Sequence, residues 1–237
     1  MQTCQAFTYN PFTNECSPQT LACPDPRGSI VNFVYTKIFD QGQKADIFFT
    51  FDLSSATTSP NDWNSVKQFL AQFIQQSTVG PSAFLIGGMT YSCFDGPQSV
   101  ISLNSYLDKK SLTQAMISLP YTDLSTQRAL AEKIRYSRSH AFSQSVGNRA
   151  EALNYVVVIS ECPLNDTLAS IYESNAAKED GINVVVVCIG KINDWDTVRD
   201  VSNIPNGVIN PLTFRGLTDG VPAKQLYDLI ILVSALH

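Results

Sequence analysis

The sequence predicts an α/β protein in which a doubly wound, mostly parallel sheet carries helices on both faces. The clearest signs are two runs of consecutive apolar residues, 156–159 and 184–187, made almost entirely of Val. Such β-branched runs are typical of strands that are covered on both faces. A helical segment at 164–178 separates them, and this strand–helix alternation requires the crossover connections of a parallel sheet. With 237 residues, 44% of them hydrophobic, the chain can form one large α/β domain plus a short extension, or two small domains.

The first predicted strand, 46–51, is an apolar run that is followed by a helix. The helix is expected to begin at Asn61 or Asp62, since either side chain can cap the first turn. Its apolar positions repeat at helical spacing along one face, which predicts that this face is buried. These positions are Trp63, Val66, Phe69, Leu70, Phe73 and Ile74.

The middle of the chain continues the alternation of strands and helices. A second strand is expected at 83–86, and a third at 100–103 is expected to form an antiparallel edge of the sheet. A short helix at 108–119 ends at a proline, and a longer helix runs from about Ser125 through the 130s. The polar stretch 138–149 is predicted to be a loop.

The last part of the chain adds three short elements after the Val-rich strands. A short helix contains Val198 and Val201, and a two-residue strand is expected at 208–209. The final helix spans 222–236, and Pro222 suits its first turn. The apolar stretches of the chain are far too short to span a bilayer, so membrane insertion is not predicted.

The first 40 residues are rich in Thr, Asn, Pro, Gln and Cys and show neither strand nor helix periodicity. They predict a loop-like, cysteine-rich extension at 1–40, ahead of a main domain at 41–237. The chain has six cysteines: Cys4, Cys16, Cys23, Cys93, Cys162 and Cys188. The N-terminal three lack both a CxxC spacing and a nearby histidine, so disulfides in an extracellular protein are favoured over a zinc site.

The sequence leaves the disulfide pairing open. Cys162 and Cys188 follow two runs that are expected to be neighbouring strands, so they form a disulfide or remain two buried thiols. Cys93 has no partner nearby in the sequence, and it could pair with the extension and leave two of the three N-terminal cysteines for each other.

Charge and motif content exclude several function classes. Charged residues make up 16% of the chain and the net charge is −5, with Lys and Arg scattered, so nucleic-acid binding is not predicted. Neither the GxGxxG nor the GxxxxGK[ST] phosphate loop is present. The two histidines, His140 in the polar stretch and His237 at the end, offer little to a hydrolase that depends on a Ser-His or Cys-His pair.

The stretch 45–56 carries the most specific pattern of the chain. Its strand ends at Asp52, and Ser54 follows, which places a carboxylate and a hydroxyl at the carboxyl edge of the sheet. A hard divalent cation takes oxygen donors of both kinds. The order strand, Asp, x, Ser resembles the first metal-site motif of the von Willebrand factor A (VWA) domain family. The segments 101–121 and 155–161 resemble later strands and loops of the same family.

This resemblance spans 46–236 and implies a central, mostly parallel six-stranded sheet, a role in adhesion or ligand binding, and no catalysis. It also implies a metal-ion-dependent adhesion site (MIDAS), where an acidic group of the partner completes the octahedron around Mg²⁺. Asp52 and Ser54 match the family's first loop, whereas Ala56 replaces the second serine and has no oxygen to give.

The other two MIDAS positions depart from the family pattern. The threonine position falls near Leu124, and a one-residue shift offers Ser125 instead, with Thr122 and Thr126 close by. Glu161 replaces the last aspartate and is one methylene longer, which matters to an ion that demands near-ideal geometry. The candidate metal ligands of this degenerate site are Asp52, Ser54, Ser125 and Glu161.

The same residues have a structural interpretation, which is favoured over tight metal binding. Asp52 and Ser54 would bond to their own loop or cap the next helix, and Glu161 would be satisfied by a helix N-terminus. The expected cofactor is therefore none, with weak binding of Mg²⁺ or Mn²⁺ left open.

The sequence thus predicts a secreted protein, or the ectodomain of a surface protein, that binds another protein or a matrix component. The binding face is expected at the loops 52–61, 121–126 and 161–166, with little or no dependence on metal. Asn165 begins an N-glycosylation acceptor pattern beside this face, although chance accounts for one such match. A glycan at Asn165 could block the face, and the helix surfaces would then be the better candidates. Two alternatives remain: an Mg²⁺-dependent adhesion domain that binds an acidic group of its ligand and, remotely, an enzyme on a doubly wound sheet.

Overall fold

The chain divides into two compact units, 1–42 and 43–237. The computed structural model of the protein describes residues 4–10, 15–21, 43–92 and 95–235. The predictions for Cys23, Cys93 and His237 lie outside these described residues.

The N-terminal unit contains strand β1 (Cys4–Asn10) and strand β2 (Glu15–Leu21), which pair antiparallel. The amino-acid composition predicts a loop-like extension here, whereas the structure has two strands. β1 contains Phe7, Thr8 and Tyr9, whose residue types favour extended backbone. This local preference accounts for the strand, although the segment shows no periodic pattern over a longer stretch.

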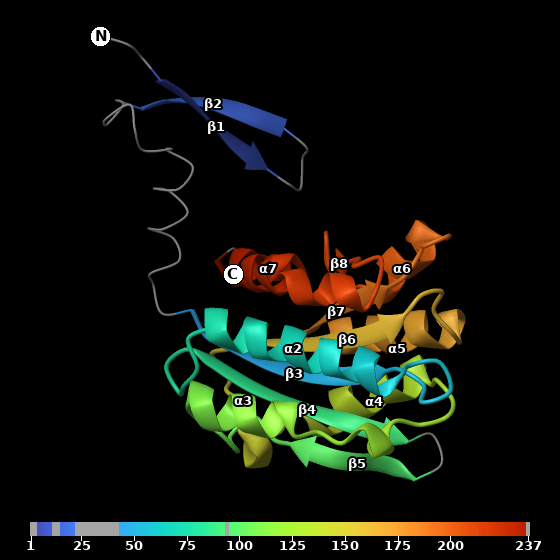
Figure 1. Cartoon of the computed structure of the whole chain (residues 1–237). Helices are drawn as coiled ribbons and strands as arrows, with labels where there is room; N and C mark the ends of the chain where they lie inside the picture. Colours follow the sequence, from blue (N-terminus) through green and yellow to red (C-terminus); the bar gives the residue numbers. More distant parts are fainter. Residues whose placement is uncertain (1–3, 11–14, 22–42, 93–94, 236–237) are drawn as a thin grey trace. The chain divides into compact units, whose positions relative to one another are not determined.

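The second unit is built on a six-stranded sheet with the order β5-β4-β3-β6-β7-β8 (Figure 1). Its strands are β3 (Ala45–Asp52), β4 (Phe84–Ser92), β5 (Gly96–Ile101), β6 (Leu153–Glu161), β7 (Ile182–Ile189) and β8 (Val208–Ile209). β5 is antiparallel to β4, and every other pair is parallel. The predicted doubly wound sheet with one antiparallel edge strand is confirmed.

Six α-helices surround the described part of this sheet. They are α2 (Pro60–Gln76), α3 (Lys109–Ile117), α4 (Leu130–His140), α5 (Thr167–Glu179), α6 (Trp195–Val201) and α7 (Val221–Ala235). Short 3₁₀ turns occur at Tyr121–Asp123, Gln144–Val146 and Arg215–Asp219. None of the helices described is long and apolar enough to pass through a lipid bilayer.

Side-chain contacts assign the helices to the two faces of the sheet. Phe49 and Phe51 of β3 lie edge-on against Phe73 and Trp63 of α2, with ring centroids 5.4 and 5.0 Å apart. On the other face, alternate residues of β6 and β7 pack in one buried cluster with residues of α4, α5 and α6; the strand residues include Val156, Val158, Val184 and Val186. The Val-rich runs are fully buried, as predicted for strands covered on both faces.

Helix α2 has the predicted buried face and a different start. All six predicted apolar positions are buried. The N-cap is Ser59, not Asn61 or Asp62 as predicted from the sequence. Ser59 and Asp62 form a reciprocal capping box with Pro60 in the first turn, so Asp62 serves as the third helical residue.

Three other boundaries also differ from the sequence predictions. β5 begins at Gly96, where a link was expected, because its pairing with β4 continues through a register shift. α5 begins at Thr167, three residues after the predicted start. α4 begins at Leu130, because a local bond from Gln127 to Ser125 and a distant bond from Ala129 to Asp52 hold the preceding residues in a loop. The helix extends to His140, within the predicted polar loop.

Candidate functional site

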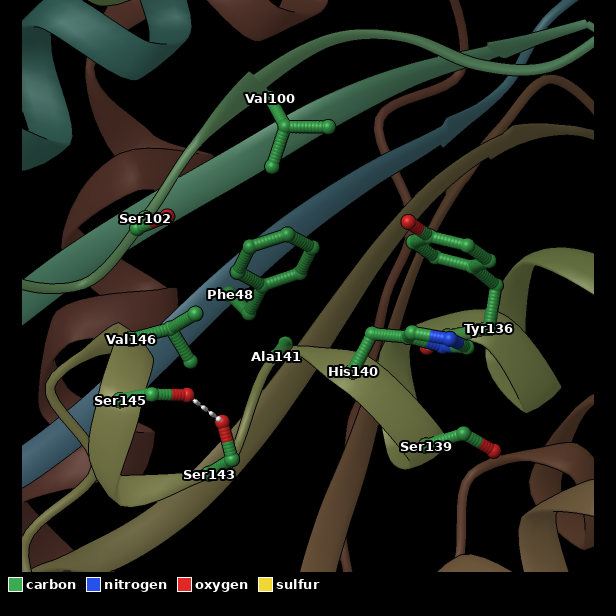
Figure 2. A pocket seen from close by; sticks show the side chains of 10 residues that line it. All are labelled: Phe48, Val100, Ser102, Tyr136, Ser139, His140, Ala141, Ser143, Ser145 and Val146. Atoms are coloured by element: carbon green, nitrogen blue, oxygen red, sulfur yellow. Dashed lines mark hydrogen bonds between the residues drawn. The ribbon is translucent and has the colours of Figure 1, made fainter.

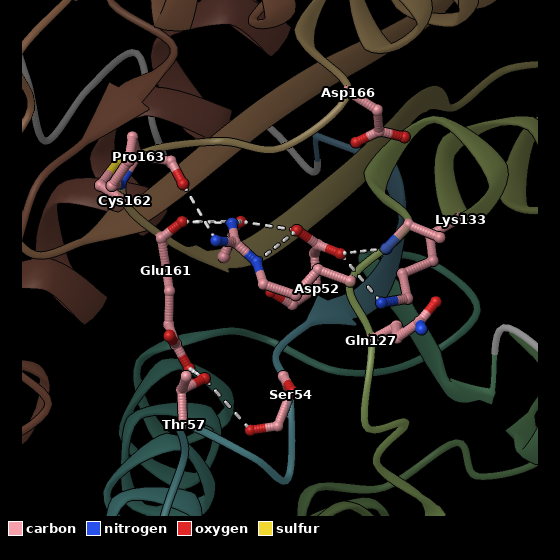
Figure 3. A network of polar contacts seen from close by, with 12 residues as sticks. Asp52, Ser54, Thr57, Gln127, Lys133, Glu161, Cys162, Pro163 and Asp166 are labelled. Atoms are coloured by element: carbon pink, nitrogen blue, oxygen red, sulfur yellow. Dashed lines mark hydrogen bonds and ion pairs between the residues drawn. The ribbon is translucent and has the colours of Figure 1, made fainter.

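The candidate site lies at the carboxyl ends of β3 and β6, where the loops 52–61, 121–129 and 161–166 meet (Figure 3). Asp52 is the last residue of β3, and its side chain is fully buried. Its register partner on β6 is Ser160, the residue before Glu161. The carboxyl edge of a doubly wound sheet is the place where such folds bind their ligands.

Both oxygens of Asp52 are bonded to protein donors. Oδ1 accepts hydrogen bonds from Nζ of Lys133 at 2.9 Å and from the backbone N–H of Ala129 at 2.9 Å. Oδ2 accepts from Nε of Arg128 at 3.1 Å and from Oγ of Ser160 at 3.0 Å. A carboxylate has about four lone-pair directions, so these four donors saturate it.

Two cations surround this one carboxylate. The side chain of Lys133 is 0% exposed and that of Arg128 is 10% exposed. Arg128 also donates to the carbonyl of Pro163 at 2.9 Å, to Oγ of Ser160 at 2.7 Å and to the Glu161 carbonyl. Burial by itself raises the pKa of Asp52, but the charges of Lys133 and Arg128 outweigh it and hold that pKa below its ordinary value.

The two candidate serines connect neighbouring loops. Oγ of Ser54 donates to the carbonyl of Thr126 at 2.6 Å and accepts from the backbone N–H of Ala56 at 3.2 Å. Oγ of Ser125 accepts from the backbone N–H of Gln127 at 3.1 Å. Both serines are buried, and their hydrogen bonds within and between the loops match the structural interpretation predicted for Ser54.

Glu161 is directed away from Asp52. Its Oε1 accepts hydrogen bonds from the hydroxyls of Thr57 and Thr58, just before helix α2. Figure 3 shows the Glu161 side chain extending toward Thr57. Leu124, at the family's threonine position, is buried and 6% exposed. Ser54 and Ser125 therefore lie on adjacent loops near Asp52. The carboxylate of Glu161 is directed to Thr57 and Thr58 instead.

This arrangement fits a divalent cation poorly. An ion about 2.1 Å from Oδ1 of Asp52 would lie at most about 5 Å from Nζ of Lys133, which itself is 2.9 Å from Oδ1. At that separation and an effective dielectric constant of 20, the repulsion is about 7 kcal/mol. Within the described ranges, no group of three or more His, Cys, Asp and Glu side chains is placed to hold a metal ion.

The N-terminus of α4 is capped by two carboxylates from other parts of the chain. Ala129, its N-cap residue, makes no side-chain hydrogen bond to the first turn. The backbone N–H of Ala129 donates to Asp52, and that of Ala131 donates to Asp166 at 3.2 Å. Burial raises the pKa of Asp166. Negative charge at a helix N-terminus is favourable, so α4 and the site stabilise each other.

A disulfide between Cys162 and Cys188 lies beside the site, with Cα atoms 5.6 Å apart. This bond was one of the two alternatives that the sequence leaves open. It joins the residue after β6 to a residue near the end of β7, and so fixes the start of the 161–166 loop.

Sequence reasoning missed Lys133 and Arg128. Lys133 stands on the buried face of α4 with Leu130, Ile134 and Ser137. A lysine within an apolar helical stripe needs a partner, because lysine is almost never fully buried unless it is paired. That pattern could have identified Lys133, whereas Arg128 lies in a loop that carries no comparable signal.

A cavity of about 330 Å³ lies away from this edge (Figure 2). Phe48, Val100 and Val146 are among its apolar walls, and Tyr136 and His140 line one side. His140 was predicted to lie in a loop, but it is the last residue of α4. Its ring stacks on Tyr136 with centroids 4.1 Å apart, and Nδ1 lies 3.1 Å from the Tyr136 carbonyl oxygen. His140 thus contributes to packing at the end of the helix.

The fold and the edge site define a class of doubly wound α/β domains whose ligand face is formed by loops at the carboxyl ends of the strands. The family of von Willebrand factor type A domains matches residues 46–220, and the chain belongs to this family. The predicted resemblance is confirmed.

Several curated proteins are similar to this chain. Chicken matrilin-1 is 26% identical over 187 residues, which are 78% of this chain and 34% of matrilin-1. The mouse collagen α-4(VI) chain is 26% identical over 69% of this chain and 7% of its own length. Mouse vitrin is 28% identical over 70% of this chain and 24% of its own length. The chain thus spans about a third or less of the length of these relatives. The relatives are secreted extracellular matrix proteins, which agrees with the extracellular localisation predicted from the sequence.

Solved structures show the same fold. Proximal thread matrix protein 1 from the mussel byssus, described with a zinc-occupied MIDAS motif, has a TM-score of 0.65 and 18% identity. The match covers 80% of this chain and 47% of that protein. Manganese-loaded Plasmodium vivax TRAP protein has a TM-score of 0.55 and 14% identity over 76% of this chain and 72% of that protein.

Proposed function

We propose that this chain is an extracellular binding module that recognises another protein or a matrix component without a bound metal ion. Its matrix relatives support a role outside the cell and are consistent with a protein that is not an enzyme. The proposed binding face comprises the loops 52–61, 121–126 and 161–166, at the edge of the sheet where the family binds its ligands.

The saturation of Asp52 carries the proposal. A MIDAS recognises its ligand through a cation that keeps one coordination position open for an acidic group of the partner. Here the carboxylate that would hold such an ion bonds instead to Lys133, Arg128, Ala129 and Ser160. Ala56 adds no oxygen, and Glu161 bonds to hydroxyls near α2. The partner would therefore be bound by the loop side chains themselves.

The exposed side chains of these loops support direct recognition. Ala56, Thr57 and Thr126 are exposed and uncharged, as is Gln127 directly after the 121–126 loop, whereas Asp166 is exposed and carries a carboxylate. A surface made mostly of methyl, hydroxyl and amide groups binds by close packing and hydrogen bonds, as many interfaces between proteins do.

Solid-phase binding to a panel of immobilised, purified matrix proteins tests the proposal. Binding should be equal in EDTA and in Mg²⁺, and Gln127→Arg should weaken it at least tenfold by placing a bulky charge on the face. Gln76→Arg is the matched control, since Gln76 is exposed at the opposite end of α2 and should bind like the wild type. Binding that EDTA abolishes would remove the proposal.

The second candidate function is Mg²⁺- or Mn²⁺-dependent adhesion. It is favoured by the two solved structures of this fold that are described with zinc and manganese. In this chain the ion would be held by Asp52, Ser54, Ser125 and a redirected Glu161, after displacement of Lys133. Binding that requires Mn²⁺ and is lost in Ser54→Ala would favour this candidate.

A further inference from the structure

Lys133 lies where a charged side chain is energetically unfavourable. Its side chain is completely buried, and its neighbours Leu130 and Ile134 on the same face of α4 are fully buried as well. Its Nζ lies 2.9 Å from Oδ1 of Asp52, which is also completely buried. Removing both charges from water is costly, and a hydrophobic pair would fill the same space without that cost. A role for the charge itself would explain why a lysine stands there.

The ammonium group joins parts of the chain that are far apart in sequence. Asp52 ends β3, and it connects through its second oxygen to Ser160 near the end of β6. Lys133 brings in helix α4, and Arg128 extends the network to the Pro163 carbonyl. The three loops of the proposed binding face are thus fastened around one buried carboxylate by two protein cations.

We propose that the Lys133 ammonium takes the place of a divalent cation at this edge of the sheet. The inference deepens the proposed function, because it names what holds the binding loops when no metal ion does so. The ammonium group of Lys133 keeps the Asp52 carboxylate ionised and balances its negative charge. It also fixes the loops in one arrangement. The site is therefore insensitive to Mg²⁺ and Mn²⁺.

The charges around the site agree with this role. The single negative charge of Asp52 faces the two positive charges of Lys133 and Arg128. A second carboxylate, that of Asp166, interacts with Asp52 and Lys133 from the N-terminus of α4, whereas the carboxylate of Glu161 is directed to the hydroxyls of Thr57 and Thr58. A divalent ion at Asp52 would therefore lie directly beside the positive groups of Lys133 and Arg128, whereas an ammonium group fixed to α4 needs no free ligand at all.

The first test uses the wild-type chain with Mn²⁺ as the probe. Free Mn²⁺ is measured by electron paramagnetic resonance at millimolar metal, together with thermal unfolding in Mn²⁺ and in EDTA. The expected result is no bound Mn²⁺ and a difference in Tm below about 1 °C, because only a ligand that binds the native state stabilises it. Mn²⁺ bound by the wild-type chain would overturn the proposal.

The second test removes the charge of Lys133. Lys133→Met keeps most of the volume and should lower Tm by roughly 10 °C, because it leaves the buried carboxylate short of a partner. Lys178→Met is the matched control at an exposed lysine of α5 and should change Tm by about 1 °C or less. A Lys133→Met variant that melts with the wild type would show that the charge is dispensable and would overturn the proposal.

A chemical rescue separates charge from volume. In Lys133→Ala, propylammonium has the size of the missing atoms, and 1-propanol has nearly the same size without the charge. Propylammonium should raise the Tm of this variant and leave the wild type unchanged, and 1-propanol should do neither. Equal effects of the two compounds, or no effect of either, would overturn the proposed role of the charge. If Lys133→Ala does not fold, the Mn²⁺ measurement on the wild-type chain still tests the proposed role of Lys133.

These tests are independent of the partner. Loss of matrix binding in EDTA would remove the proposed function even if the isolated chain binds no Mn²⁺ in solution. Binding of Mn²⁺ by the isolated wild-type chain would overturn the role of Lys133 while metal-independent matrix binding could still stand.

Discussion

Asp52→Asn is expected to destabilise the protein more than any exposed charge substitution. The change leaves the fully buried Lys133 without its carboxylate and presents a donor amide to Arg128 and Ser160, which are themselves donors. Breaking a buried pair by removing one partner costs about 3–5 kcal/mol. Since the total free energy of unfolding of a protein is about 5–15 kcal/mol, this loss is a large fraction of it.

Urea unfolding followed by tryptophan fluorescence measures this loss, because Trp63 is 1% exposed and becomes solvated on unfolding. The midpoint should fall at an unchanged slope. Asp228→Asn is the control: Asp228 pairs with Lys224 on the surface of α7, where such a pair contributes at most about 1 kcal/mol. A loss below about 1 kcal/mol for Asp52→Asn would refute the idea that Asp52 is the anionic centre of the site.

Four further outcomes are expected. Because the pKa of Asp52 is lowered in the folded state, its stabilising effect is present above the unfolded-state value, about 4, and is lost as the pH falls through the folded value. The stability difference between wild type and Asp52→Asn should therefore shrink in urea titrations below pH ~4, and a constant difference would contradict this. Ser59→Ala should cost about 1 kcal/mol through the lost capping box of α2, whereas Ser59→Thr, which keeps the hydroxyl that bonds to Asp62, should cost less, and equal losses in urea unfolding would argue against capping. Replacing both Cys162 and Cys188 by Ser should lower stability by about 3 kcal/mol, because the bond closes a loop between residues 26 apart, and unchanged unfolding midpoints would show that the bond is not formed. Asn165 is exposed, so the chain secreted from eukaryotic cells should lose mass on enzymatic deglycosylation, and Asn165→Gln should not.

Burial patterns made the fold predictable from the sequence. The Val-rich segments of β6 and β7 are buried on both faces, and the six apolar positions of α2 form its buried side. These signals are local and repeat over several residues, so each remains readable without knowledge of distant contacts. The order of strands and helices then restricts the topology to a doubly wound sheet.

Element ends were less predictable, because they depend on single hydrogen bonds. The start of α2 is set by Ser59 and its reciprocal bond with Asp62, and Asn61 is an equally good cap by residue type alone. The start of α4 is set by Asp52, which is 77 residues from Ala129 in the chain. No local pattern carries that information.

The position of the candidate site was predictable from the sequence, whereas the groups that bond to Asp52 were not. Asp52 and Ser54 were placed correctly at the carboxyl edge, because the strand that precedes them has an unmistakable apolar pattern. The cation that faces Asp52 comes from Lys133, which is 81 residues away. The family pattern specifies oxygen ligands at this edge, and nothing in it indicates an ammonium group beside Asp52.

The way α4 is capped ties the formation of this helix to the rest of the domain. Its first amides are satisfied by Asp52 and Asp166, which reach it from β3 and from the start of α5. The helix therefore has no self-contained start and becomes stable only once the sheet edge has assembled. The amide protons of Ala129 and Ala131 should accordingly exchange with deuterium at the rate of the opening of the whole edge, which makes them internal reporters of its integrity.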